Sequence, residues 1–217
     1  MIVFNSIILK KEQSVSIVLM LMLFSFTILF IRISITKTWY YLFLVWNIFL
    51  AIIPYLITMY LLDKKKLNKI GFGLVFLIWL AFLPNAPYII TDLYHLSRST
   101  VQNIWIDTLV ISTFAITGMF VFYFSLFQMK NLLLVYFNRK TAHAIIIITI
   151  FLSAFGVYIG RFFRYNSWEI LSKPFQIFKA IFHMITQPII NQEVWLFTFS
   201  LSLFLWLGYF VFNKLKN

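Results

Sequence analysis

Hydrophobic residues occur along this chain in long blocks, and charged residues separate the blocks at similar distances. Six of the blocks contain 19 to 25 consecutive residues without lysine, arginine, aspartate or glutamate. A helix needs about 20 apolar residues to cross a hydrocarbon core about 30 Å thick. The pattern therefore predicts a bundle of six transmembrane helices, at approximately residues 14–31, 39–62, 70–83, 108–129, 142–160 and 194–213.

The composition indicates lipid rather than water as the solvent of this chain. Hydrophobic residues make up 62% of the 217 residues, charged residues make up 11%, and the mean hydropathy is +0.93. Soluble domains carry about 25% charged residues, and a soluble chain of this length could not bury so much apolar surface. We therefore predict an all-α integral membrane protein in which residues 1–217 form a single polytopic membrane domain.

The excess of basic residues indicates the kind of partner. The net charge is +12, and the lysines and arginines cluster beside the apolar blocks, where they favour contact with anionic lipid headgroups. No soluble basic face is predicted, so we expect the lipid bilayer as a partner and no nucleic acid. The chain has no cysteine and no histidine spacing typical of a metal site. We therefore expect no metal and no cofactor.

The distribution of basic residues also predicts an orientation. If the N-terminus lies in the cytoplasm, the cytoplasmic segments carry 11 lysines and arginines, and the outer segments carry 7. Cytoplasmic loops are enriched in these residues, so we expect both termini in the cytoplasm. Most of the acidic residues then lie on the outer side, namely Asp92, Asp107, Glu169 and Glu193.

The third block is interrupted by two prolines in the segment FLPNAPYIITDLYHL, which covers residues 82–96. Proline removes a backbone hydrogen-bond donor, and its ring clashes with the preceding turn. We therefore expect the third helix to break near Leu83. Broken helices occur in membranes where they are buried in protein or line a wet cavity.

The polar half of this segment is predicted to form a short re-entrant or interfacial helix over residues 87–97, at the outer membrane boundary. Asn85 is expected to cap it, with Pro87 in its first turn. One face of this helix carries polar groups at positions i, i+4 and i+7, and the other face is apolar. The residues of the polar face are Tyr88, Asp92 and His95.

A second polar motif ends the fifth block, in the segment GVYIGRFFRYNSWE over residues 156–169. Gly156 and Gly160 form a G-x-x-x-G pair, which allows two helix backbones to approach closely. Asn166 and Glu169 have the spacing of a capping box at the start of another short helix. The residues expected at the same outer boundary as the first motif are Arg161, Arg164, Asn166 and Glu169.

Residues 175–187 are predicted to form an amphipathic helix that lies in the membrane interface before the last span. In the segment PFQIFKAIFHMITQP, apolar and polar residues occupy opposite helical faces. The apolar face carries Phe178, Ile181, Phe182 and Ile185. Such a helix could cover the outer face of the bundle.

The two polar segments resemble the signature segments of a family of bacterial multi-pass membrane proteins, domain-of-unknown-function family 1361. FLPNAPYIITDLYHL and YIGRFFRYNSWE carry the resemblance, which extends roughly from the second span to the sixth. It implies a location in the bacterial plasma membrane and no particular activity. The family pattern leads us to expect aspartate after NSW, whereas this chain has Glu169, whose carboxylate lies one methylene further from the backbone.

The polar residues of the two motifs allow a catalytic and a structural interpretation. In the catalytic interpretation, the candidate acid/base residues and carboxylates are Asp92, His95 and Glu169. The candidate ligands of an anionic substrate are Arg161, Arg164, Asn166, Asn85 and Tyr88. Guanidinium groups suit planar anions, although arginines at a helix end also extend to lipid headgroups. In the structural interpretation, Asp92 forms an ion pair with Arg161 or Arg164 that joins the two motifs.

Three hypotheses of function follow. The first is an enzyme that acts at the outer leaflet on an anionic lipid or a lipid-linked envelope precursor. The second is a non-catalytic scaffold subunit of a membrane complex, whose polar motifs hold the fold together. The third is a transporter or transporter subunit, because broken helices build substrate sites in transporters. The transporter ranks last, because the spans carry almost no charge at their centres and show no internal repeat.

Overall fold

The chain is helical in the part that the structure describes. A computed structural model describes residues 2–63, 67–163 and 174–216, and no strand occurs among them. Six helical stretches of the described residues are long and apolar enough to cross a membrane, which confirms the predicted all-α bundle. These stretches are Glu12–Thr36, Tyr40–Asp63, Lys69–Arg98, Ile104–Leu133, Arg139–Phe163 and Gln192–Leu215.

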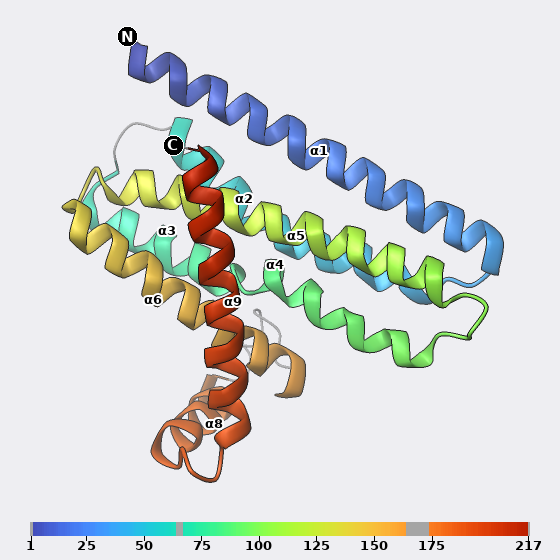
Figure 1. Cartoon of the computed structure of the whole chain (residues 1–217). Coiled ribbons are helices and arrows are strands. Elements are labelled where there is room, and N and C mark those ends of the chain that lie inside the picture. The colour runs from blue at the N-terminus through green and yellow to red at the C-terminus, as the bar shows by residue number, and fades with distance from the viewer. Residues whose placement is uncertain (1, 64–66, 164–173, 217) are drawn as a thin grey trace.

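Figure 1 shows the order of the elements along the chain. The first half contains α1 (Ile2–Thr36), η1 (Tyr40–Leu42), α2 (Phe43–Asp63), α3 (Lys69–Phe82), α4 (Asn85–Tyr88) and η2 (Ile89–Arg98). The second half contains α5 (Ile104–Leu133), α6 (Arg139–Tyr158), η3 (Ile159–Phe163), α8 (Pro174–Thr186) and α9 (Gln192–Lys216). The elements η1 and η2 are 3₁₀-helices, and η3 is π-helical.

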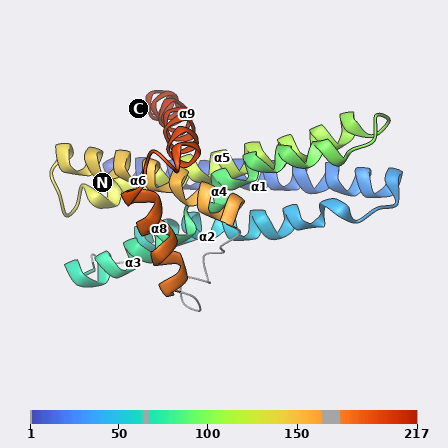
Figure 2. The same cartoon turned by 90° about the horizontal axis from the view of Figure 1, so that it is seen from below.

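Helix α5 lies at the centre of the bundle. In the most apolar 18-residue stretch of α5, 67% of the residues are buried, whereas 22% are buried in the corresponding stretches of α1 and α9. It packs against α1, α2, α4, η2, α6 and α9. In Figures 1 and 2, α1 and α2 run alongside α5, whereas α9 crosses the bundle and packs mainly on α6.

Buried polar side chains connect α5 to three neighbouring helices. Such groups need partners within the protein, because lipid offers them none. The bonded pairs are Ser25–Thr117 to α1 (3.0 Å), Thr58–Gln128 to α2 (2.7 Å) and Trp79–Ser125 to α3 (2.8 Å). Each pair fixes the register between α5 and one neighbour.

Helices α3 and α6 begin at asparagine caps. The side chain of Asn68 accepts a hydrogen bond from the Gly71 amide at 2.7 Å, and that of Asn138 accepts one from the Thr141 amide at 2.9 Å. These bonds satisfy backbone donors that the first turn of a helix leaves without an intrahelical partner. Both caps lie at the end of the bundle away from the connection between α1 and α2 (Figure 1).

The connection between α1 and α2 lies beside the connection between η2 and α5 at the other end of the bundle (Figures 1 and 2). Helix α1 ends at Thr36, and Lys37 adopts a left-handed backbone with a φ of 53°. The Lys37 amide donates to the carbonyl of Ile33 at 2.8 Å, which is a common way to end a helix. The chain then reverses into η1 and α2, so polar residues of both connections meet.

Helix α8 coincides with the amphipathic segment predicted at residues 175–187. Met184 is buried against Tyr158 of α6, and Ala180 packs against the same cluster. Phe182 and Ile185, on the predicted apolar face, remain exposed. The helix therefore contacts the bundle through Ala180 and Met184.

Candidate functional site

The third predicted span is broken at the expected place. Helix α3 ends at Phe82, and α4 begins at Asn85. With 14 residues, α3 is about 21 Å long, which is shorter than the hydrocarbon core. The stretch that is long enough to cross is Lys69–Arg98, which includes α4 and η2.

Asn85 does not cap the new helix, which corrects the prediction. Pro84 occupies the cap position of α4, no side-chain bond caps it, and Asn85 is the first helical residue. The Asn85 amide instead donates to the carbonyl of Phe82 at 2.8 Å. In an unbroken helix this carbonyl would accept from the Ala86 amide, which bonds to Leu83 here at 3.2 Å. Asn85 therefore stabilises the end of α3.

Glycines on α5 and α6 allow these two helices to contact the break. A side-chain carbon on Gly156 of α6 would lie 2.6 Å from Cγ of Pro84. One on Gly118 of α5 would lie 2.6 Å from the carbonyl oxygen of Ala86. Neither distance is tolerable for a carbon atom, so only glycine fits. Gly156 makes the kind of close approach that its motif predicts, whereas Gly118 carries no such signal in the sequence.

The polar half of the first motif is a 3₁₀-helix, and this shifts its polar face from the predicted one. The ten residues of η2 have about three residues per turn, so every third residue shares a face. That row contains Asp92, His95 and Arg98. The first side chain is buried, the second is partly buried and the third is exposed. Tyr88 precedes η2. Such long 3₁₀ runs are uncommon.

Asp92 connects three elements from a buried position. The residue is 1% exposed, and Oδ2 of its carboxylate accepts a hydrogen bond from the Asn47 amide of α2 at 2.7 Å. Oδ1 accepts one from Arg161 of η3 at 3.1 Å. Arg161 also reaches the Tyr88 hydroxyl at 3.5 Å and lies over the Tyr94 ring at 5.4 Å. The ion pair of the structural interpretation is thus formed by Arg161.

His95 continues the polar row towards the surface. Its Nε2 lies 3.8 Å from Oδ1 of Asp92, and its Nδ1 lies 3.1 Å from the hydroxyl of Tyr40 on η1. The same hydroxyl accepts a hydrogen bond from Arg98 at 3.3 Å. A guanidinium group only donates, so Tyr40 can donate its own proton to Nδ1, and the proton of the neutral ring then lies on Nε2, facing Asp92. These four side chains form a polar chain from a buried carboxylate to an exposed arginine.

The structure brings part of the predicted site together. Asp92, His95, Arg161 and Tyr88 lie in one cluster. Asn85 belongs to the helix break instead. The other predicted members, Arg164, Asn166 and Glu169, lie outside the residues that the structure describes.

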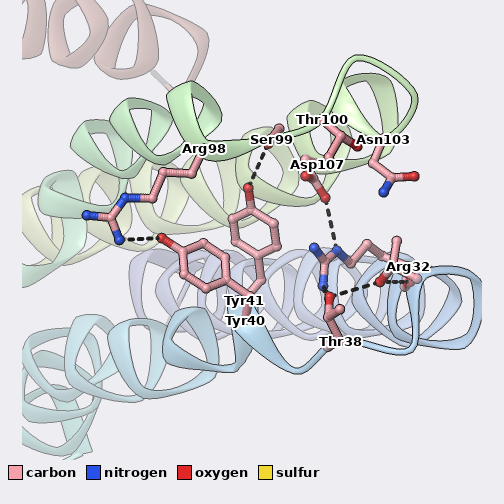
Figure 3. A pocket seen from close by; sticks show the side chains of 10 residues that line it. Arg32, Thr38, Tyr40, Tyr41, Arg98, Ser99, Thr100, Asn103 and Asp107 are labelled. Atoms are coloured by element: carbon pink, nitrogen blue, oxygen red, sulfur yellow. Dashed lines mark hydrogen bonds and ion pairs between the residues drawn. The ribbon is translucent and has the colours of Figure 1, made fainter.

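A cavity of about 240 Å³ lies between the two adjoining connections, and Figure 3 shows the residues that line it. A buried ion pair forms part of its wall, in which Nε of Arg32 donates to Oδ1 of Asp107 at 2.9 Å. Arg32 also donates to the carbonyl of Thr38 at 2.8 Å, and its guanidinium group lies 4.6 Å from the centre of the Tyr41 ring. These contacts join the end of α1 to the start of α5.

Residues that carry hydroxyl or amide groups make up much of the remaining lining, although carbon atoms form most of its accessible surface. They are Thr36, Thr38, Ser99, Thr100 and Asn103. Tyr40 and Arg98 line the cavity as well, and their side chains meet in Figure 3. Because both residues also belong to the polar chain of Asp92, the cavity is connected to the buried carboxylate through Tyr40 and His95.

Sequence reasoning missed several of these residues. Asn47 is the only amide side chain within the second charge-free block, and an amide in an apolar span indicates a buried partner. This signal could have placed it in the site. Arg32, Tyr40 and Asp107 lie near the ends of apolar blocks, where charged and aromatic residues are ordinary, so no local signal pairs them.

Proton transfer and anion contact are the chemistry that this arrangement offers. An imidazole between a carboxylate and a hydroxyl can accept or deliver a proton. Guanidinium groups bind phosphate or carboxylate through planar, paired donors. Within residues 2–63, 67–163 and 174–216, histidine, aspartate and glutamate side chains form no group of three that could hold a metal ion.

The helices and this cluster define a multi-pass membrane protein whose polar residues gather where the broken third span meets the end of α6. A family model described as "Protein of unknown function (DUF1361)" matches residues 46–207, about three quarters of the chain. The chain belongs to this family, which confirms the resemblance of its two polar segments. No curated protein and no solved structure matches the chain. The matched range contains Asp92 and Arg161, whereas Arg32 and Tyr40 precede it.

Proposed function

We propose that this protein is an enzyme of the bacterial plasma membrane that acts at the extracytoplasmic face on an anionic lipid or a lipid-linked envelope precursor. The observation that supports the proposal is the polar chain from Asp92 through His95 and Tyr40 to a cavity. The excess of basic residues on the opposite side favours cytoplasmic termini and therefore an extracytoplasmic site.

His95 is the acid/base residue in this proposal. Its side chain is 22% exposed, and its partner Tyr40 reaches the cavity. Asp92 is a positioning residue, because it is buried and both of its carboxylate oxygens already have partners. The 3.8 Å between Nε2 of His95 and Oδ1 of Asp92 is long for a hydrogen bond, but such contacts often tighten when substrate binds.

Arg161 supplies a contact to an anionic group of the substrate. Its hydrogen bonds to described residues both start from Nη1, and the planar guanidinium group suits phosphate. Tyr88 holds the same group through its hydroxyl. Arg164, Asn166 and Glu169 follow closely in the chain and remain predicted members of the site.

Turnover of lipids by the purified protein tests this proposal. The protein is placed in vesicles of bacterial lipids and lipid-linked envelope precursors, and the lipid species are followed by mass spectrometry. His95→Gln should slow conversion at least about 100-fold, because it removes the acid/base group. The matched control is His143→Gln, which changes a histidine in the first turns of α6 and should have no effect. Equal conversion by His95→Gln, or no conversion by the unaltered protein, would contradict the proposal.

A non-catalytic scaffold is the second candidate, and one observation favours it. Because Asn47 and Arg161 satisfy both oxygens of Asp92, the cluster can hold α2, η2 and η3 together without a substrate. A scaffold should copurify stoichiometrically with one partner and tolerate Asp92→Asn. A transporter has less support, because Asn85 and two glycines occupy the break that a transported substrate would need.

A further inference from the structure

We propose that the cavity between the α1–α2 connection and the η2–α5 connection binds the headgroup of an anionic phospholipid through its phosphodiester and hydroxyl groups. The cavity adjoins the Asp92 cluster, and its lining includes Tyr40 and Arg98 of the polar chain that leads to it. A volume of about 240 Å³ suits a headgroup, whereas sites for whole drug-sized molecules start at about 300 Å³.

The charge of the lining favours a single negative charge on the ligand. Arg32 and Asp107 neutralise each other at 2.9 Å, and both are almost fully buried. Arg98 is exposed, and its Nη1 donates to the Tyr40 hydroxyl. Among the described residues, no carboxylate lies within ion-pair distance of Arg98. The lining therefore carries one net positive charge, which matches a phosphodiester.

The polar groups of the lining suit a ligand that also carries hydroxyl groups. The Thr36 hydroxyl donates to the carbonyl of Arg32 and can still accept, and the Ser99 hydroxyl shares a hydrogen bond with Tyr41. Thr100 presents a hydroxyl that can donate or accept, and Asn103 presents an amide. These groups come from the two sides of the cavity. A glycerol or sugar headgroup would therefore find partners on both sides while its phosphate meets Arg98.

The surroundings indicate a lipid rather than a free phosphate as the source of this chemistry. Trp39 and Trp105 flank lining residues and are 68% and 58% exposed. Exposed tryptophans favour the headgroup level of a bilayer. Ile104, which precedes Trp105 in the chain, is exposed as well. A headgroup held in the cavity can thus keep its acyl chains against apolar side chains.

The inference rests on the proposed function in placing this end of the bundle at a membrane surface and in taking the cavity as the place where an anionic lipid binds. Binding can nevertheless be measured without any turnover. Detergent-solubilised protein is titrated with phosphatidylglycerol, and bound lipid is counted by native mass spectrometry. Phosphatidylcholine with the same acyl chains provides a probe without net charge. We expect the unaltered protein to retain phosphatidylglycerol in preference to phosphatidylcholine.

Two variants assign the binding to the cavity. Arg98→Gln should weaken retention of phosphatidylglycerol about tenfold, because it removes a charge-assisted contact. Thr100→Trp fills the cavity from its exposed side and should abolish the preference. The matched control is Arg139→Gln, an exposed arginine at the other end of the bundle, which should leave retention unchanged. An unchanged melting temperature shows that each variant folds.

The outcomes separate this inference from the proposed enzyme. Unaltered retention by Arg98→Gln and Thr100→Trp would overturn the cavity as a headgroup site, whatever His95→Gln does to turnover. Full displacement of the lipid by glycerol phosphate would overturn the lipid assignment and indicate a soluble ligand. If both variants lose retention of phosphatidylglycerol but the unaltered protein converts no lipid, the headgroup site would be supported and the proposed enzymatic function would be contradicted.

Discussion

The ion pair between Asp92 and Arg161 leads to a quantitative prediction about stability. The side chains are 1% and 14% exposed, and the interacting atoms lie 3.1 Å apart. Removal of one member of a buried pair costs about 3–5 kcal/mol, because the other charge stays buried. Arg161→Gln should cost this amount, since the carboxylate then keeps one hydrogen bond, from the Asn47 amide, while Nε2 of His95 lies 3.8 Å away. Asp92→Asn should cost about 2–3 kcal/mol, because the more exposed guanidinium group keeps a neutral acceptor.

The double variant measures the coupling between the two side chains. Two amides can bond to each other at the same place, so Asp92→Asn with Arg161→Gln should cost about 2–3 kcal/mol less than the two single changes together. Equilibrium unfolding of the purified variants in mixed micelles provides the free energies. As a control, Asp92→Asn combined with Arg139→Gln should be additive, because Arg139 begins α6 at the far end of the bundle. If the first pair is also additive within about 0.5 kcal/mol, the two side chains do not interact and the link between the motifs is wrong.

Three further predictions concern the helix break and the topology. Gly118→Ala should be about 1–3 kcal/mol less stable than Gly73→Ala in the same unfolding assay. Both changes improve helix propensity, but only the methyl group added at Gly118 would lie 2.6 Å from a backbone oxygen. Equal stabilities would mean that α5 does not contact the break. Asn85→Ala should cost about 1–3 kcal/mol, because it leaves a carbonyl of α3 without its donor; unchanged stability would mean that water or another group satisfies it. The chain has no cysteine, so Val101→Cys and Asn138→Cys can be labelled singly in cells, and only the first should react with an impermeant maleimide added outside; labelling of both from one side would contradict the topology.

The sequence was sufficient to predict features that depend on local chemistry. Charge-free blocks of sufficient length predict helices in lipid, and the part of the chain that the structure describes has six stretches of that kind. A pair of prolines within an apolar block predicts the break between Phe82 and Asn85. The meeting of the two motifs could also be predicted, because a buried Asp92 needs a cation and Arg161 lies at the matching end of another span.

Features that depend on long-range packing could not be predicted in the same way. The role of Asn85 follows from which carbonyl loses its amide at the break, and the residue type alone suggests a cap. The spacing of Tyr88, Asp92 and His95 predicts an α-helical face, whereas η2 is a 3₁₀-helix, and 3₁₀ runs of this length are uncommon. The cavity arises where Arg32 and Asp107 pair across 75 residues, and neither residue differs locally from an ordinary charge at a span boundary.

A helix interrupted by proline is often the hinge of a membrane protein, but the contacts of this one oppose such a role. Gly156 and Gly118 bring two other helices within contact of Pro84 and Ala86, so bending at this point would require α5 and α6 to move as well. The interruption is therefore held in place by the helices around it. We expect motion within the bundle in elements that contact few other helices. Helix α9 is such an element, since it packs mainly on α6 and little of it is buried.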